Sequence, residues 1–174
     1  LAASRELIKE NGWTAVSIRA VASRCSVSAG TIYNYYESKA DLLGDTIESI
    51  WREIFFNPED EQVFKDVAAC ISWIYKRLEY GNEQFPGFFS LHSLGFMKDE
   101  KMDGKKKMLQ TWGHILNGLC DILKNDPKIR PDVFDEQFTE KQFADILFSL
   151  ILVSMIRQDY NPSSILMLIN KTLY

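Results

Sequence analysis

The sequence of 174 residues has few of the side chains that build metal centres and disulfide scaffolds. It contains three cysteines and two histidines, and the cysteines form no CxxC pair. An odd number of widely spaced cysteines is typical of a reduced, cytoplasmic protein rather than a disulfide-stabilised one. The same residues lack the spacing of zinc ligands, so we expect neither a metal site nor a cofactor.

Long apolar runs are also missing. The longest nearly apolar stretch, Phe143 to Ile156, contains Asp145 and is shorter than the roughly 20 residues that a membrane span needs. No basic start followed by an apolar run and a small-residue cleavage site indicates a signal peptide, so we expect no membrane partner. Because the chain begins at Leu1 rather than Met, we expect a few residues to precede it.

Catalytic motifs are missing as well. The sequence has no GxSxG nucleophile elbow and no polar cluster with the spacing of an active site. Two histidines and many serines leave a hydrolytic triad open in principle, but nothing in their spacing favours one. We therefore expect the protein not to be an enzyme.

What is present indicates a globular, all-α protein. Apolar residues make up 46% and charged residues 25% of the chain, which is too apolar for intrinsic disorder. Period-two alternation is missing, whereas apolar residues recur at helical spacing between Gly, Pro and Asn breaks. Ser17, Ser28, Ser38 and Thr139 are the predicted helix caps. The pattern predicts helices over about 1–10, 17–25, 28–36, 38–56, 59–80, 101–124, 139–157 and 163–173.

The net charge of −4 at first argues against a nucleic-acid partner, since such domains usually carry a basic surplus. The charge is unevenly distributed, however. Residues 1–40 contain five basic and three acidic residues, a balance of +2, so the remaining 134 residues account for −6. The acidity therefore lies mainly outside the N-terminal segment and does not exclude DNA.

The informative motif runs from Ser17 to Leu43. Two short helices are joined by a tight turn, with the small residue Ala22 at the contact between them. This is the helix-turn-helix pattern, whose second helix enters the major groove of DNA.

The second helix of the motif has the chemistry that a DNA interface needs. Free N–H groups at its first turn favour phosphate, and Gly30 allows a close approach of the DNA backbone. Asn34 suits bidentate recognition of adenine, and Tyr or Thr suits phosphate or the thymine methyl group. Ile32 and Tyr36 are spaced to point inward instead. The candidate DNA-binding residues of this helix and its flanks are Ser28, Ala29, Gly30, Thr31, Tyr33, Asn34, Tyr35 and Lys39.

These residues resemble the N-terminal DNA-binding domain of the tetracycline-repressor (TetR) family of bacterial transcription regulators. The likeness covers about the first fifty residues and rests on Ala22, Val27, the run Gly30-Thr31-Ile32-Tyr33, Tyr36, Ser38-Lys39 and Leu42-Leu43. One position departs from it: Ser26 stands where the family usually has Gly. If Ser26 adopts a positive φ there, the strain costs about 1 kcal/mol.

The resemblance implies a division into a helix-turn-helix domain, residues 1–46, and a helical ligand-binding and dimerisation domain, residues 47–174. The first has three helices and a fourth that links it to the second. DNA contacts then also come from Ser17 and Arg19, although Arg19 could pair with a carboxylate instead. Tyr33 and Lys39 are expected to hold phosphates and Asn34 to read a base. The implied protein is a homodimer that binds double-stranded operator DNA and releases it on binding an effector.

The second part of the chain allows an aromatic ligand pocket. Twelve of the 22 aromatic residues lie between Trp51 and Trp112, and such pockets suit small apolar or aromatic molecules. An ordinary aromatic core explains the same residues equally well. The candidate ligand-binding residues are Trp73, Tyr80, Phe88, Phe89, His92, Phe96, Trp112 and His114.

The helix predicted from Thr139 to Arg157 is apolar almost all round, which indicates burial on more than one side. With the last helix it is the best candidate for a two-fold interface, in agreement with the family; the alternative is a fully internal helix. The candidate interface residues are Phe143, Leu147, Leu150, Ile151, Ser154, Met155, Ile165, Leu168 and Ile169.

The preferred hypothesis is a homodimeric, effector-responsive transcriptional repressor. A DNA-binding regulator that responds to a protein partner, or to nothing, is the first alternative. A helical interaction module that does not bind DNA is the second.

Overall fold

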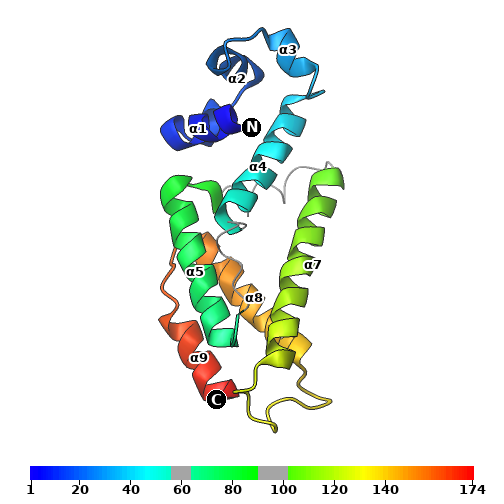
Figure 1. Ribbon diagram of the computed structural model, residues 1–174, viewed down its shortest axis with the longest axis vertical. Coiled ribbons are helices and arrows are strands. Elements are labelled where there is room, and N and C mark those ends of the chain that lie inside the picture. Colours follow the sequence, from blue (N-terminus) through cyan, green and yellow to red (C-terminus); the bar gives the residue numbers. More distant parts are fainter. Residues whose placement is uncertain (56–63, 90–101) are drawn as a thin grey trace. The chain divides into compact units, whose positions relative to one another are not determined.

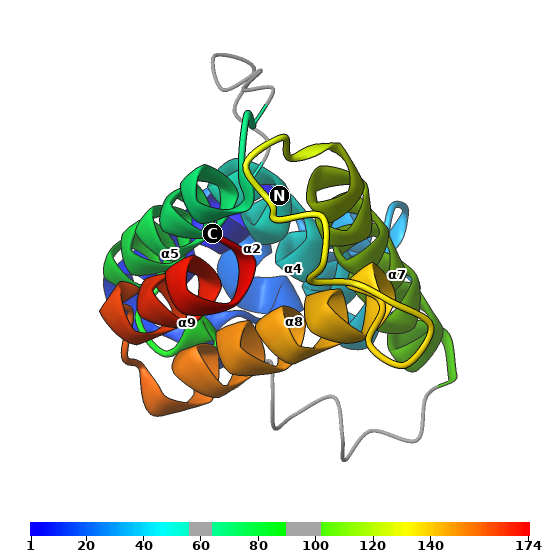
Figure 2. The same cartoon turned by 90° about the horizontal axis from the view of Figure 1, so that it is seen from below.

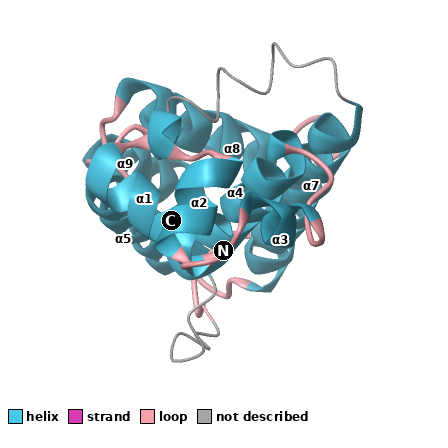
Figure 3. Ribbon diagram, turned by 90° about the horizontal axis from the view of Figure 1, so that it is seen from above, coloured by secondary structure: helices cyan, strands magenta, loops and turns pink. Residues whose placement is uncertain are grey.

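The computed structural model describes residues 1–55, 64–89 and 102–174, with side chains in the last range from residue 113 onward. Throughout these residues the regular structure is helical, which confirms the predicted all-α class (Figures 1 and 3). The chain forms two compact units. Unit 1 consists of Leu1–Glu61 and Tyr80–Phe88, and unit 2 of Gln62–Glu79 and Phe89–Tyr174.

Unit 1 begins with four α-helices and a short 3₁₀ turn. Their bounds are α1 Ala2–Asn11, η1 Trp13–Ala15, α2 Ile18–Arg24, α3 Ala29–Tyr33 and α4 Lys39–Phe55. Apolar side chains from these helices form the core, where Ile8, Leu42 and Ile50 are at most 1% exposed. Burial of such side chains stabilises the unit far more than the partly exposed ion pairs around it.

Hydroxyl side chains cap the helices at the predicted positions. The Oγ atoms of Ser17, Ser28 and Ser38 and the Oγ1 of Thr139 each accept a hydrogen bond from the backbone N–H three residues on. The donor–acceptor distances are 3.1 to 3.3 Å. Each bond satisfies one of the N–H groups that a helix start leaves unpaired, so the sequence sets where these helices begin.

A second segment of the chain completes unit 1. Helix α5, Val67–Gln84, crosses the boundary between the units after Glu79, and the residues that follow it pack into unit 1. The Phe88 ring lies 6.3 Å from that of Trp13 and 5.6 Å from that of Trp51, and Phe85 lies 6.3 Å from Phe88. We call these four residues the aromatic cluster.

The aromatic cluster bears on the expected domain division. Phe85 and Phe88 are 0% and 2% exposed, so they belong to the core of the unit that carries the helix-turn-helix. The two compact units are therefore not consecutive stretches of sequence. The division into functional domains at residues 46 and 47 remains a prediction.

Unit 2 contains most of α5 together with α7, Met102–Asn125, α8, Glu140–Arg157, and α9, Ser163–Leu173 (Figure 2). The Tyr75 hydroxyl on α5 is 2.7 Å from the Ser154 hydroxyl on α8. The buried carboxylate of Asp126 accepts hydrogen bonds from the Val67 N–H at 2.9 Å and the Tyr174 hydroxyl at 2.6 Å. Asp126 thus holds the start of α5 and the end of α9 beside the segment that follows α7.

Candidate nucleic-acid interface

The helix-turn-helix is built on a small apolar contact. Ile18, Val21 and Ala22 of α2 are buried, as is Ile32 of α3. The small side chain of Ala22, 3% exposed, allows the two helices to approach closely. This contact fixes the face of α3 that turns inward, so the opposite face is left exposed.

The turn between α2 and α3 depends on one strained residue. Ser26 has a φ of 56°, in the left-handed region that favours glycine. The Ser26 N–H donates to the Ser23 carbonyl at 3.1 Å, and the Val27 N–H donates to the Ala22 carbonyl at 3.0 Å. These bonds hold the turn, and Ser26 adopts the positive φ at the position where the resembled family usually has glycine.

The first turn of α3 is open to an approaching molecule. The Ser28 hydroxyl accepts the Thr31 N–H and also lies 3.0 Å from the Thr31 hydroxyl. Gly30 is exposed, and a Cβ placed there would meet only the Ser28 Oγ, at 3.6 Å. Ala29 and Thr31 are partly buried. This end of the helix therefore presents backbone N–H groups with little side-chain cover.

Three polar side chains at the end of α3 are exposed. Tyr33 is 55% and Tyr35 79% exposed, and Asn34 is exposed between them. Large exposed aromatic residues on a monomer commonly mark a binding surface. By contrast Ile32 is buried and Tyr36 is partly buried, as predicted, and burial together with nearby Asp45 raises the pKa of the Tyr36 hydroxyl.

Lys39 and Arg19 add positive charge to this end of unit 1. Lys39 is exposed at the first residue of α4, next to the Ser38 cap. Arg19 is exposed in the first turn of α2, and no carboxylate of the described residues lies within 4.0 Å of it. The alternative in which Arg19 forms an ion pair therefore finds no partner among those residues, and its guanidinium is available.

Arg24, the other basic residue of α2, is paired with carboxylates of α1. Its guanidinium donates to both carboxylate oxygens of Glu10, and it lies 3.4 Å from a Glu6 oxygen. The hydrogen bond to Arg24 holds the pKa of Glu10 below its usual range. Arg24 thus joins α2 to α1, which explains why it is a weaker candidate for DNA contact than Arg19.

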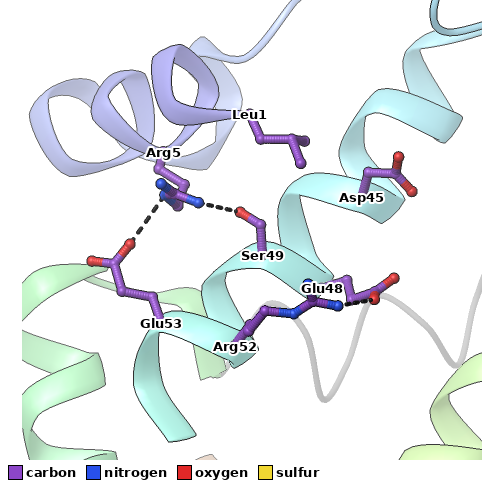
Figure 4. A pocket seen from close by; sticks show the side chains of 7 residues that line it. All are labelled: Leu1, Arg5, Asp45, Glu48, Ser49, Arg52 and Glu53. Atoms are coloured by element: carbon purple, nitrogen blue, oxygen red, sulfur yellow. Dashed lines mark hydrogen bonds and ion pairs between the residues drawn. The ribbon is translucent and has the colours of Figure 1, made fainter. Parts of the chain in front are cut away.

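A cleft of about 480 Å³ lies between α1 and α4 in unit 1 (Figure 4). It is lined by Leu1, Arg5, Asp45, Glu48, Ser49, Arg52 and Glu53. Arg5 lies 3.0 Å from a Glu53 oxygen and donates to the Ser49 hydroxyl at 2.8 Å, and Arg52 lies 3.1 Å from Glu48. The charges that line the cleft are largely paired with one another, and none of the predicted ligand-binding residues lies there.

The structure distributes the predicted ligand-binding residues over both units. Tyr80 and Phe88 belong to unit 1, whereas Trp73, Phe89 and His114 belong to unit 2. Trp73 packs against Phe64 at 5.2 Å, Phe89 packs against Tyr160 at 6.2 Å, and His114 is exposed. His92 and Phe96 lie outside the described residues, as does the side chain of Trp112.

Tyr160 is a polar group of unit 2 that the sequence pattern did not single out. Its hydroxyl is buried and finds no hydrogen-bond partner among the residues that the structure describes. Burial raises the pKa of this hydroxyl to about 12, so it is a neutral donor at physiological pH. A buried unpaired hydroxyl costs about 1–3 kcal/mol and is available to a ligand oxygen.

Most of the predicted interface residues pack inside the protomer. Their exposed fractions are 5% or less at Phe143, Leu147, Ile151, Met155, Ile165 and Ile169, and Ser154 is bonded to Tyr75. Leu150 and Leu168 are exposed. The exposed apolar face of α8 and α9 also includes residues that the sequence pattern did not select: Ile146, Val153, Ile156 and Met167.

The helical period explains which side chains of α8 are exposed. Phe143, Leu147 and Ile151 follow one another at four-residue intervals on the buried side, while Ile146, Leu150 and Val153 lie on the other. A helix that is apolar on both sides offers no contrast in its sequence, so only the packed structure assigns the two faces.

In the described residues no helix has the length and apolarity to cross a bilayer, and no three His, Cys, Asp or Glu are grouped to hold a metal.

Comparison with known proteins agrees with this geometry. Residues 1–46 match the family described as "Bacterial regulatory proteins, tetR family". A stretch of 43 residues is 40% identical to the HTH-type transcriptional regulator UidR of Escherichia coli (strain K12), covering 25% of this chain and 22% of UidR. The N-terminal segment is therefore similar to this family, and the curated relative that it matches is a helix-turn-helix regulator. The matched stretch spans only about a fifth of the curated relative.

Solved structures resemble the chain over nearly its full length. FadR from Bacillus subtilis, in complex with stearoyl-CoA, has a TM-score of 0.69 and 20% identity over 99% of this chain and 97% of that one. A transcriptional regulator from Rhodococcus sp. Rha1 has a TM-score of 0.65 and 16% identity over 93% and 82%. At this identity the likeness shows a shared fold, with a helical second part following a helix-turn-helix domain.

The strained turn leads to a prediction about stability. Ser26→Gly should raise the free energy of unfolding of unit 1 by about 1 kcal/mol, because glycine adopts a positive φ without the steric cost that serine carries. Ser23→Gly is the matched control: Ser23 is exposed within α2, and glycine there should lower stability by about 0.5–1 kcal/mol. Urea unfolding measures both changes. Equal destabilisation by the two variants would contradict the strain at Ser26.

Proposed function

We propose that the protein is a sequence-specific DNA-binding transcriptional regulator that acts as a homodimer. The observation that carries the proposal is the exposed end of α3. Tyr33 and the two residues that follow the helix, Asn34 and Tyr35, are exposed there, while Ile32 fixes the inward face of the helix. The match of residues 1–46 to the TetR family supports it. The N-terminal N–H groups and Lys39 supply phosphate contacts, and Asn34 supplies the contact to a base.

Two substitutions separate these roles. On a duplex that the protein prefers, Asn34→Ala should cost about 1–3 kcal/mol of binding free energy and relax the preference at one base pair. Lys39→Ala should weaken binding to all duplexes about equally and reduce the slope of log K against log salt by about 0.9, because one counterion fewer is released. Fluorescence anisotropy titrations at several salt concentrations measure both effects.

Lys124→Ala is the control for charge, since Lys124 is exposed near the end of α7 in unit 2. It should change neither the affinity nor the salt slope. If Asn34→Ala leaves the base preference unchanged and Lys39→Ala behaves like Lys124→Ala, this face of unit 1 is not the DNA-binding surface.

We further propose that α8 and α9 form the dimer interface through their exposed apolar side chains. Six of the ten exposed large hydrophobic residues of the described chain lie on these two helices. Clustered exposed apolar side chains of this size mark association surfaces. A pair of helices can pack against its own copy about a two-fold axis, because the same surface then serves both protomers.

Val153→Glu tests this interface, since Val153 is 44% exposed on α8. A carboxylate there would be buried without a partner in the dimer, so dimerisation should weaken by about 2 kcal/mol or more. Asn117→Glu, at an exposed position of α7, adds the same charge elsewhere and should leave the dimer intact. Sedimentation equilibrium gives the dimer dissociation constants. A wild-type monomer, or a Val153→Glu protein that dimerises like wild type, contradicts the interface.

The effector that we propose is a molecule with an apolar chain or ring and a hydrogen-bond acceptor. The ring of Phe89 and the unpaired Tyr160 hydroxyl in unit 2 support such a ligand. The stearoyl-CoA bound to FadR of Bacillus subtilis, a protein of the same fold, makes long acyl-CoA the first class to test. An effector that favours the DNA-free arrangement lowers DNA affinity by a coupling free energy, typically about 1–3 kcal/mol.

Addition of stearoyl-CoA should therefore raise the melting temperature of the protein and weaken its binding to DNA, while free coenzyme A should do neither. Differential scanning calorimetry and the anisotropy titration measure the two responses. If acyl-CoAs of every chain length leave the melting temperature unchanged, a regulator without an acyl effector is the better description.

A further inference from the structure

An aliphatic side chain lies exposed in the turn that precedes α3. Val27 is 40% exposed and stands directly before the Ser28 cap. Of the residues that the structure describes, four in unit 1 are large, hydrophobic and exposed, and Val27, Tyr33 and Tyr35 are three of these. The two tyrosines carry hydroxyl groups, whereas Val27 exposes only methyl groups. The candidate DNA-binding face therefore contains an apolar element that contacts to phosphate do not explain.

The backbone on both sides of Val27 is held in place. The Val27 N–H donates to the Ala22 carbonyl of α2 at 3.0 Å. The next residue, Ser28, is fixed by its cap on the Thr31 N–H. A β-branched side chain has few rotamers, so valine loses little side-chain entropy when its methyl groups are covered. Val27 is therefore a rigid apolar contact surface.

The residues that follow Val27 offer few free polar side-chain groups to a base. Ala29 and Gly30 carry none. The Ser28 Oγ accepts the Thr31 N–H and lies 3.0 Å from the Thr31 hydroxyl, so both hydroxyls already have a partner within the protein. An apolar contact is therefore the chemistry that this part of the motif offers to a base edge.

The major groove of DNA presents one apolar group that such a surface fits. Thymine alone among the four bases carries a methyl group there, at C5. We propose that Val27 is a specificity-determining residue that contacts the 5-methyl group of a thymine in each half-site. This role rests on the proposed function and adds an apolar base contact to the hydrogen bonds of Asn34.

Replacing single thymines by deoxyuridine tests this contact from the side of the DNA, because the two bases pair alike and differ only by the methyl group. The probe is a duplex that the full chain has selected from a random pool, and fluorescence anisotropy gives the dissociation constants. Loss of one buried methyl group should weaken binding by roughly three- to fivefold at one thymine of a half-site. The other thymines should respond little.

Val27→Ala tests the contact from the side of the protein. It should bind the thymine duplex roughly three- to fivefold more weakly than the wild type does, and should bind the thymine and deoxyuridine duplexes about equally. Val133→Ala is the matched control, because Val133 is a partly buried valine between α7 and α8 in unit 2. It should keep the wild-type ratio of the two dissociation constants. A loss of stability alone lowers binding to both duplexes and leaves this ratio unchanged.

The outcomes separate this role from the proposed function. A selected duplex without any thymine whose replacement weakens binding overturns the role of Val27 and leaves the DNA-binding proposal standing. The same conclusion follows if Val27→Ala keeps the wild-type ratio of the two dissociation constants. A pool that yields no preferred duplex overturns the proposed function, and the role of Val27 with it.

Discussion

The packing of Phe88 against Trp51 and Trp13 is the contact on which the organisation of the molecule depends. It brings a segment that lies beyond α5 into the core of the unit that carries the helix-turn-helix. Aromatic side chains of this size bury a large apolar area, and pairs with tilted or edge-on rings add a further 0.5–1.5 kcal/mol or so. The N-terminal unit is therefore completed by residues that come after the start of the second unit.

Within the N-terminal unit, the buried residues fix the positions of the helices, and the exposed residues form the candidate DNA-binding face. Ile32 and Ala22 lock α3 against α2, and the serine caps set where the helices begin. Ser26 adopts a strained positive φ in the short turn between α2 and α3, and Arg24 is paired with Glu10 and Glu6 of α1. At the end of α3 the exposed side chains of Tyr33, Asn34 and Tyr35 are polar and aromatic, and Arg19 and Lys39 add exposed basic groups, which is the chemistry that phosphates and base edges require. The acidic balance of the whole chain does not conflict with this, because the surplus of negative charge lies beyond the first forty residues.

Local signals made the first part of the chain predictable. A hydroxyl before an apolar run marks a helix start, and this follows from neighbouring residues alone. The question of a positive φ at Ser26 comes instead from the family resemblance, in which Gly usually stands at this position. The roles of Phe85 and Phe88 could not be predicted in this way, because their partners Trp13 and Trp51 are distant in sequence and every aromatic residue favours burial equally. The same limit applies to α8, where Leu147 and Leu150 are alike in sequence and opposite in exposure. Tyr160 carries no local signal at all.

The central claim is that the exposed end of α3 recognises a particular DNA sequence. The most direct measurement is repeated selection of bound duplexes from a random pool at moderate salt. The account predicts enrichment of a two-fold related sequence whose half-sites are centred about 10 base pairs, or a multiple of that spacing, apart, as two recognition helices of a symmetric dimer require. A pool that stays random after selection, with binding that depends on salt alone, would contradict it.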